Sequence, residues 1–284
     1  MDGVTHREPI AVQLSSGRFL SGTTRGPLNG RPVLFVAGAA TGKTMGFGDD
    51  RLHERGIRLL TMDRPGMGSS TPDPKRTVFS TSDDYHAFVT TAVGDDRPVA
   101  VVANSQGSVF AMAMAQAGFA SSLTLVSPAD EVAHPDVHAL LPPQTAALVD
   151  MIRDAPQEAR KVFEAFTVDA MESMVVSTAG PGDRAFYTGE PFRTVYRTAL
   201  KEGFANDGTG YVHDTLMAMS SWPVSLSRLR CPVRILFGED DRTHSPDHGA
   251  TLAKRMPSAE HKVVDGAGGA LLWTHADLVL RCAV

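Results

Sequence analysis

Several features that would point to particular classes of protein are missing from this chain of 284 residues. It has two cysteines, Cys231 and Cys282, which are too few for a disulfide framework or a cysteine metal cluster. Its net charge is −5 and its pI is about 6.0, so it lacks the basic surface that binding to nucleic acid or to an anionic membrane requires. We therefore expect neither nucleic acid nor a membrane as a partner.

Long apolar runs are also missing. No run reaches membrane-spanning length, and the N-terminal segment MDGVTHREPI lacks the apolar core of a signal peptide. These absences predict a protein located in the cytoplasm. No internal repeat or low-complexity tract is present, and the length suits one large domain or a domain that carries an insertion.

Strand and helix patterns alternate along the chain, whose 42% hydrophobic and 21% charged residues are typical of a globular protein. Two alternating segments around a Ser-Gly turn, 10–14 and 18–22, predict an antiparallel hairpin. Buried strands are predicted at 33–36, 57–62, 99–102, 123–126, 233–237 and 261–264, and helices at 82–93 and 109–117, with a helix end at 51–55. Such alternation predicts right-handed crossovers and an α/β fold with a mostly parallel sheet.

One segment, residues 130–222, breaks this alternation. It contains several amphipathic helical patterns separated by prolines and glycines, and no convincing strand. We interpret it as a helical cap inserted into a core formed by residues 1–129 and 223–284. We expect most of its large apolar side chains in the core and some of them in the wall of a ligand cavity. They are Met151, Phe163, Phe166, Met171, Met174, Phe192, Met217 and Met219.

The most informative stretch is ANSQG at residues 103–107, between a buried strand and an Ala- and Met-rich helix. So short a connection requires small residues on both sides of its apex, because larger side chains would collide there. Ala103 and Gly107 meet this requirement and leave Ser105 exposed at the end of the strand. The pattern is that of a nucleophile elbow with alanine in place of its usual first glycine. An ordinary βα loop with a capping serine is the alternative interpretation.

Together with several other segments, this stretch makes the chain similar to the α/β-hydrolase family over essentially its whole length. In chain order the matching segments are FVAGAATG, DRPGMGSS, ANSQG, the helical cap, GEDDRTHSP and GAGGALLWTHAD. The resemblance implies the α/β-hydrolase fold, with a mostly parallel twisted sheet, flanking helices and an inserted helical cap. It also implies a capped member of the family that resembles esterases and lactonases.

The resemblance assigns catalytic roles by position. Ser105 would be the nucleophile, and the backbone N–H groups of Ala39 and Gln106 would form the oxyanion hole. A serine hydroxyl is a weak nucleophile at neutral pH, so it also needs a base to take its proton.

The acid that orients this base would be Asp241, which follows the predicted strand at 233–237. Its neighbour Asp240 is a second candidate. Asp130, which follows the predicted strand at 123–126, is an alternative acid in this fold.

The expected base itself is missing. The family places its histidine after a glycine-rich turn, and the matching position here is Gly269. Loss of one member of such a triad typically costs on the order of 10⁴-fold in rate. A displaced histidine could replace it, and His244, three residues after Asp241, is the leading candidate. His134 at the start of the cap and His275 in the last helix are alternative bases.

Two other interpretations of Gly269 remain open. The cavity could serve a non-hydrolytic step, as in a lyase, cyclase or isomerase, or only bind a small hydrophobic ligand, because an oxyanion hole polarises a carbonyl without a base. Gly269 could also be an engineered replacement of histidine that traps a complex.

A different class of function is suggested by residues 37–44, AGAATGKT, which fit a relaxed phosphate-loop pattern after a strand. Asp63 at the end of the next strand could then hold magnesium. Alanine replaces the first glycine of this pattern, where the backbone must wrap around the phosphate. Nucleotide binding at 37–44 is therefore a remote alternative.

Our main prediction is a serine hydrolase that acts on a small, largely apolar carbonyl compound such as an ester, a thioester or a lactone. Ser105, Asp241 and His244 would be catalytic. We expect no metal and no organic cofactor, because neither a ligand cluster nor a cofactor motif is present. The sequence gives no indication of the oligomeric state.

Overall fold

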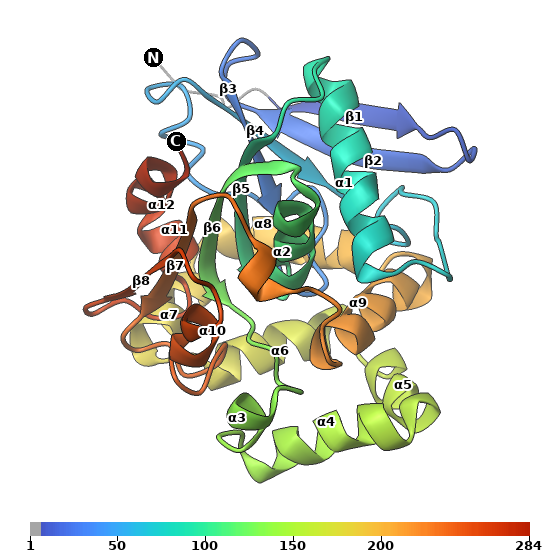
Figure 1. Cartoon of the computed structure of the whole chain (residues 1–284), viewed down its shortest axis with the longest axis vertical. Coiled ribbons are helices and arrows are strands. Elements are labelled where there is room, and N and C mark those ends of the chain that lie inside the picture. The colour runs from blue at the N-terminus through green and yellow to red at the C-terminus, as the bar shows by residue number, and fades with distance from the viewer. Residues whose placement is uncertain (1–6) are drawn as a thin grey trace.

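A single sheet organises the chain. The computed structural model describes residues 7–284, and its sheet has eight strands in the order β1-β2-β4-β3-β5-β6-β7-β8 (Figure 1). The pairs β1–β2 and β2–β4 are antiparallel, and the other pairs are parallel. The strands are β1 (Arg7–Gln13), β2 (Phe19–Arg25), β3 (Arg31–Val36), β4 (Ile57–Met62), β5 (Val99–Ser105), β6 (Ala120–Pro128), β7 (Val233–Gly238) and β8 (Ala259–Val264). The predicted α/β fold with a mostly parallel sheet is confirmed.

Helices cover both faces of this sheet. One face packs against α1 (Val78–Val93), α2 (Ser108–Ala117) and α10 (Ala250–Lys254), and the other against α11 (Leu271–Thr274) and α12 (Ala276–Ala283). Successive side chains of a strand point to opposite faces, so a strand covered on both sides needs an unbroken apolar run. In β5, Val101 belongs to the first core and Val102 to the second.

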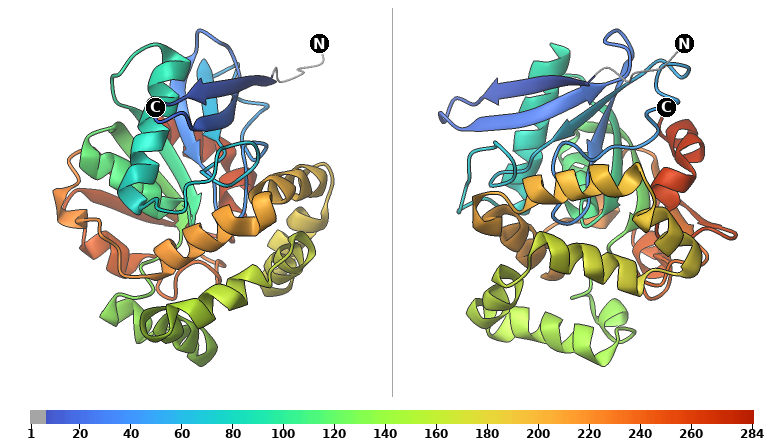
Figure 2. Two further views of the ribbon diagram at one scale, coloured as in Figure 1. Left: turned by 90° about the vertical axis from the view of Figure 1, so that its right-hand side faces the viewer. Right: turned by 180° about the vertical axis from the view of Figure 1, so that it is seen from behind.

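The remaining helices lie between β6 and β7 in the chain. They gather on the side of the molecule where β6 ends (Figures 1 and 2). They are α3 (Pro135–His138), α4 (Pro143–Asp154), α5 (Pro156–Glu164), α6 (Val168–Thr178), α7 (Pro181–Thr188), α8 (Phe192–Gly203) and α9 (Thr209–Met219), with the 3₁₀ helices η1 (Asn206–Gly208) and η2 (Leu226–Arg228). The boundaries of a separate cap at 130 and 222 stay a prediction. Between residues 7 and 284, no helix is both long and apolar enough to cross a membrane.

Two helix predictions are wrong, although every predicted strand is present. Residues 51–55 form turns instead of a helix end. Helix α1 begins at Val78, four residues before its predicted start, so the two aspartates assigned to its first turn lie further along it. The hydroxyl of Thr77 accepts the Ser80 N–H at 3.1 Å, and the Ser80 hydroxyl accepts the Thr77 N–H at 2.8 Å. This capping box uses serine in place of the usual glutamate, so the sequence pattern did not reveal it.

The arginine of the DRPGMGSS turn is fully buried. Arg64 is 1% exposed, pairs with Asp214 of α9 and donates to the carbonyl oxygens of Ala37 and Gly38 at 2.8 Å each. The Asp214 carboxylate also pairs with Arg76. A buried charge requires such partners, because its loss of hydration is otherwise uncompensated. The cluster therefore ties the loop after β3, the loop after β4 and α9 to one another.

We predict that Asp214→Ala lowers the free energy of unfolding by about 3–5 kcal/mol, because it leaves two buried guanidinium groups without their carboxylate. Urea unfolding followed by circular dichroism measures this change. The matched control is Asp169→Ala, which removes an 80% exposed carboxylate bonded to Arg197 at 2.7 Å and should cost at most about 1 kcal/mol. Equal losses in the two variants would contradict a structural role for the buried cluster.

Candidate active site

The loop between β5 and α2 has the backbone of a sharp elbow. Ser105 lies at its apex with a φ of 50°, in the left-handed region that costs a residue with a side chain about 1–2 kcal/mol. A Cβ on Gly107 would lie 2.4 Å from the Val36 carbonyl oxygen, so only glycine fits there. The helix that follows can therefore pack directly against β3 and present Ser105 at the end of the strand.

The two predicted oxyanion donors have free N–H groups. Within residues 7–284, neither the Ala39 N–H nor the Gln106 N–H has an acceptor. The carbonyl groups before Ala39 point the other way, because Arg64 binds both of them, and the Thr41 hydroxyl also donates to that of Gly38 at 3.1 Å. Buried N–H groups are rarely left without a partner, and unpaired ones near a serine are suited to binding a developing negative charge.

A carboxylate and an imidazole lie together on the loop after β7. Asp241 is 2% exposed, and its two oxygens lie 3.0 and 2.9 Å from Nδ1 of His244. The N–H and the hydroxyl of Thr243 each donate to the same carboxylate at 3.1 Å. These bonds fix the carboxylate, and the bond to Nδ1 leaves Nε2 of the ring available for other chemistry.

Both pKa values are shifted in the sense expected of an ion pair. Burial alone would raise the pKa of Asp241, but the charge and hydrogen bond of His244, with smaller contributions from Ser127 and Thr243, hold it well below its usual range. Burial alone would lower the pKa of His244, but Asp241, and more weakly Asp183, raise it above the ordinary value of 6.5. The charged pair is therefore favoured over the neutral one.

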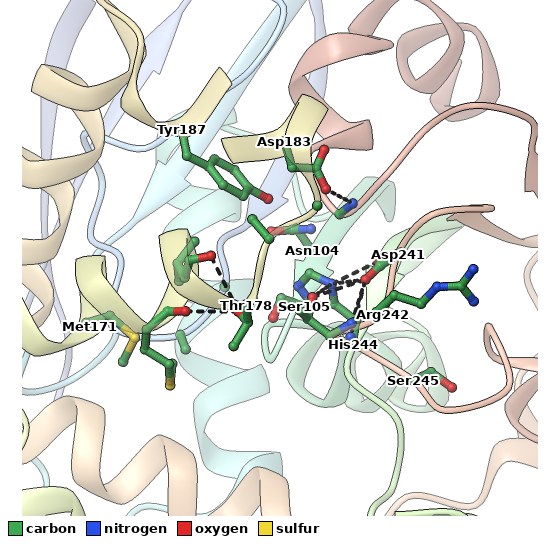
Figure 3. Close-up of a pocket in the computed structure, with 18 of the residues that line it drawn as sticks. Asn104, Ser105, Met171, Thr178, Asp183, Tyr187, Asp241, Arg242, His244 and Ser245 are labelled. Atoms are coloured by element: carbon green, nitrogen blue, oxygen red, sulfur yellow. Dashed lines mark hydrogen bonds and ion pairs between the residues drawn. The ribbon is translucent and has the colours of Figure 1, made fainter. Parts of the chain in front are cut away.

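His244 and Ser105 line the same cavity (Figure 3). They come from the carboxyl ends of β7 and β5, which are separated by β6 alone, so their backbones lie roughly 10 Å apart. Side chains reach across such a distance. In the part of the chain that the structure describes, no hydrogen bond joins the Ser105 hydroxyl to an imidazole. In serine hydrolases this contact often tightens only when substrate is bound.

Gly269 lies directly against the ring of His244. A Cβ placed on Gly269 would be 3.2 Å from Cε1 of His244 and 3.4 Å from an oxygen of Asp241. The imidazole of His244 thus occupies the space next to the position at which the family carries its histidine. The N–H groups of Gly269 and Ala270 donate to the Asp183 carboxylate of α7, at 2.6 and 3.2 Å.

Asp240, the second candidate for the acid, lines the cavity but is exposed, whereas the remaining candidate residues lie elsewhere. His134 caps α3 by accepting the Asp136 N–H at 3.3 Å, and the His275 ring lies 2.9 Å from the Thr274 hydroxyl. Neither histidine lines the cavity that contains Ser105. Asp130 is buried and bonded to Ser245 at 3.2 Å, and it does not line the cavity either. Burial raises the pKa of Asp130.

The cavity has a volume of about 770 Å³, which suits a small organic ligand. Of the eight large apolar side chains expected mostly in the core and partly in the wall, Met171, Met174 and Phe192 line the cavity and Phe163 packs in the core. Met151 is exposed, contrary to that expectation. Asp183 and Tyr187 of α7 are among the polar residues of the wall that sequence reasoning missed. No local motif marks them, because they approach the site only through the packing of α7.

The phosphate-loop interpretation of residues 37–44 is not supported. The ammonium group of Lys43 pairs with Asp63 at 2.7 Å, and the Thr44 hydroxyl donates to Glu202 at 2.6 Å. A phosphate loop also needs a helix behind it, whose N-terminus faces the phosphates. The residues between β3 and β4 form only turns. Among residues 7–284, no three or more His, Cys, Asp or Glu side chains are grouped so that they could hold a metal ion.

Comparison with known proteins identifies the family. A sequence model of the alpha/beta hydrolase family matches residues 33–281. A hydrolase from Pseudomonas aeruginosa superposes with a TM-score of 0.70 at 17% identity, covering 96% of each chain. An enol-lactonase from Burkholderia xenovorans superposes with a TM-score of 0.68 at 15% identity, and the match covers 96% of this chain and 97% of the lactonase. A thermophilic esterase from Thermogutta terrifontis superposes with a TM-score of 0.66 at 19% identity, and the match covers 97% of this chain and 96% of the esterase. The chain therefore belongs to the alpha/beta hydrolase family.

Proposed function

We propose that the protein is a serine hydrolase that cleaves small, largely apolar esters, thioesters or lactones, with His244 as its base. The observation that carries this proposal is the position of the His244 ring, bonded to Asp241, against Gly269 and in the cavity of Ser105. The similarity to esterases and to an enol-lactonase supports the ester-type class of substrate. The apolar wall of the cavity supports a small apolar substrate.

The reaction would follow the usual two stages of acyl transfer. The Ser105 oxygen attacks the carbonyl carbon while Nε2 of His244 takes its proton, and Asp241 stabilises the resulting imidazolium. The N–H groups of Ala39 and Gln106 bind the oxyanion. His244 then gives the proton to the leaving alcohol or thiol, and water releases the acid from the acyl-enzyme by the same steps. These steps require no metal or organic cofactor.

The contact between His244 and Gly269 also bears on the origin of the glycine. Simple removal of a histidine by engineering would leave space beside Asp241. The imidazole of His244, which comes from a different loop, instead occupies that space. This supports a natural displacement of the base over an engineered replacement of histidine by Gly269.

A non-hydrolytic reaction in the same cavity would not need an activated serine. The two proposals differ in the reactivity of Ser105, which a fluorophosphonate measures directly.

We predict that Ser105→Ala abolishes fluorophosphonate labelling, and that His244→Ala lowers both labelling and kcat/KM on a p-nitrophenyl ester by about 10³–10⁴-fold. His275→Ala is the matched control and should react like the unmodified protein, since its ring lies outside the cavity. Lack of labelling in the unmodified protein would contradict hydrolysis and favour a lyase, an isomerase or a binding protein. Full activity in His244→Ala would contradict the assigned base.

We predict that the double variant His244→Ala, Gly269→His has a kcat/KM about tenfold or more above that of His244→Ala alone. The reason is that the new ring enters the space that His244 vacates beside Asp241. The backbone of Gly269 does not have a positive φ, so it accepts a side chain. Gly269→Ala in the same background is the control and should restore nothing. A double variant that folds normally by circular dichroism but stays inactive would show that the two positions do not share one catalytic role.

We predict that kcat/KM rises with pH through a midpoint above 6.5. The base acts only when it is neutral, and the neighbouring carboxylates raise the pKa of His244 above 6.5. Asp183→Asn should move this midpoint to lower pH, since it removes one of the negative charges that stabilise the imidazolium. A pH profile of initial rates provides the measurement. A midpoint at or below 6.5 in the unmodified enzyme would contradict the assignment.

A further inference from the structure

The hydroxyl of Tyr187 faces the cavity and has no hydrogen-bond partner among the described residues. The side chain comes from α7, is 7% exposed and lines the cavity, and its hydroxyl makes no hydrogen bond to any residue between 7 and 284. Phe192 and Trp273 hold the ring, with centroid distances of 5.7 and 6.3 Å. Figure 3 shows the hydroxyl end of Tyr187 directed into the cavity, toward the region that contains Asn104.

The amide oxygen of Asn104 is a second such group, and it lies beside Ser105. Asn104 is 4% exposed, and its Nδ2 donates to the Val126 carbonyl oxygen at 2.9 Å. Only the NH₂ group can donate to a carbonyl, so this bond fixes which way the amide points. A Cβ on Gly38 would lie 3.2 Å from the Cβ of Ser105 and 3.4 Å from Oδ1 of Asn104. That oxygen is therefore a near neighbour of the serine, and no donor of the described chain reaches it.

We propose that Asn104 and Tyr187 form a subsite for a hydroxyl group next to the reacting carbonyl, so that the substrates are esters, thioesters or lactones of 2-hydroxy acids. A hydroxyl suits this pair because it can donate to Oδ1 of Asn104, which only accepts, and accept from the phenol of Tyr187. The subsite rests on the proposed function, since the carbonyl bound at Ser105 brings the adjacent carbon close to Asn104.

The subsite offers a ligand one hydrogen-bond donor and one acceptor. Burial, together with the negative charges of Asp183 and Asp241, raises the pKa of Tyr187, so its phenol stays protonated and donates. The Asp183 carboxylate already accepts two backbone N–H groups, and Asp241 is paired with His244. A bound substrate without the hydroxyl would exclude water from both polar groups of the subsite and leave them unpaired, which is the kind of loss that discriminates well between substrates.

The test compares methyl 2-hydroxybutanoate with methyl butanoate by pH-stat. The unmodified protein should prefer the hydroxy ester in kcat/KM, and Tyr187→Phe, which removes only the phenolic oxygen, should lower this preference by about 3–10-fold. Tyr211→Phe is the matched control. Tyr211 is 3% exposed, packs against Phe163 and Phe204 and does not line the cavity, so its variant should keep the preference.

A second experiment measures binding in the absence of turnover. Calorimetry gives the affinities of the two esters for Ser105→Ala and for the double variant Ser105→Ala, Tyr187→Phe. Failure of hydrolysis and of fluorophosphonate labelling would overturn the proposed function, while binding would still report on the subsite. Hydrolysis or binding without preference for the hydroxy ester, or a preference that Tyr187→Phe leaves unchanged, would overturn the subsite. Stronger preference for methyl 2-aminobutanoate would overturn the choice of a hydroxyl.

Discussion

The buried guanidinium of Arg64 is the point on which the other parts of this structure depend. It turns two consecutive carbonyl groups of the loop after β3 toward itself, at 2.8 Å each, and thereby leaves the next N–H of that loop facing the cavity. It is held in turn by Asp214, which belongs to a helix from the segment between β6 and β7. One buried charge therefore ties the loop that carries Ala39, which lines the cavity, to α9, in a place where water cannot compete for it.

If the proposed mechanism holds, the Asp241–His244 pair on the β7 loop reaches the catalytic geometry of the family from a different position in the chain. In the proposed mechanism the acid and the base are three residues apart, on one loop, whereas the family takes them from two loops. Their mutual distance then depends only on the backbone of that loop, which Thr243 braces by two bonds to the carboxylate. Position in space, rather than position in the sequence, decides whether the imidazole can serve Ser105.

Sequence reasoning reached the parts of the fold that local patterns determine. The apolar run of β5 and the small residues around Ser105 are sufficient to predict a buried strand and a tight turn, because both follow from sterics within a few residues. The start of α1 was missed because Ser80 closes its capping box in place of glutamate. The remote phosphate-loop alternative is weakened by the pairing of Lys43 with Asp63, 20 residues further along the chain, which the local pattern does not reveal. The roles of Asp183 and Tyr187 depend on how α7 packs against the turn after β8, and no pattern in the sequence gives that packing.

The bond between Asp183 and the turn at Gly269 has a consequence for how the cavity could open. Helix α7 forms part of the cavity wall and also carries the carboxylate that caps this turn. Any displacement of α7 that widens the entrance would break two backbone hydrogen bonds and withdraw a negative charge from the neighbourhood of His244. Such a displacement would therefore lower the pKa of His244, and ligand access and the proton affinity of the imidazole would change together.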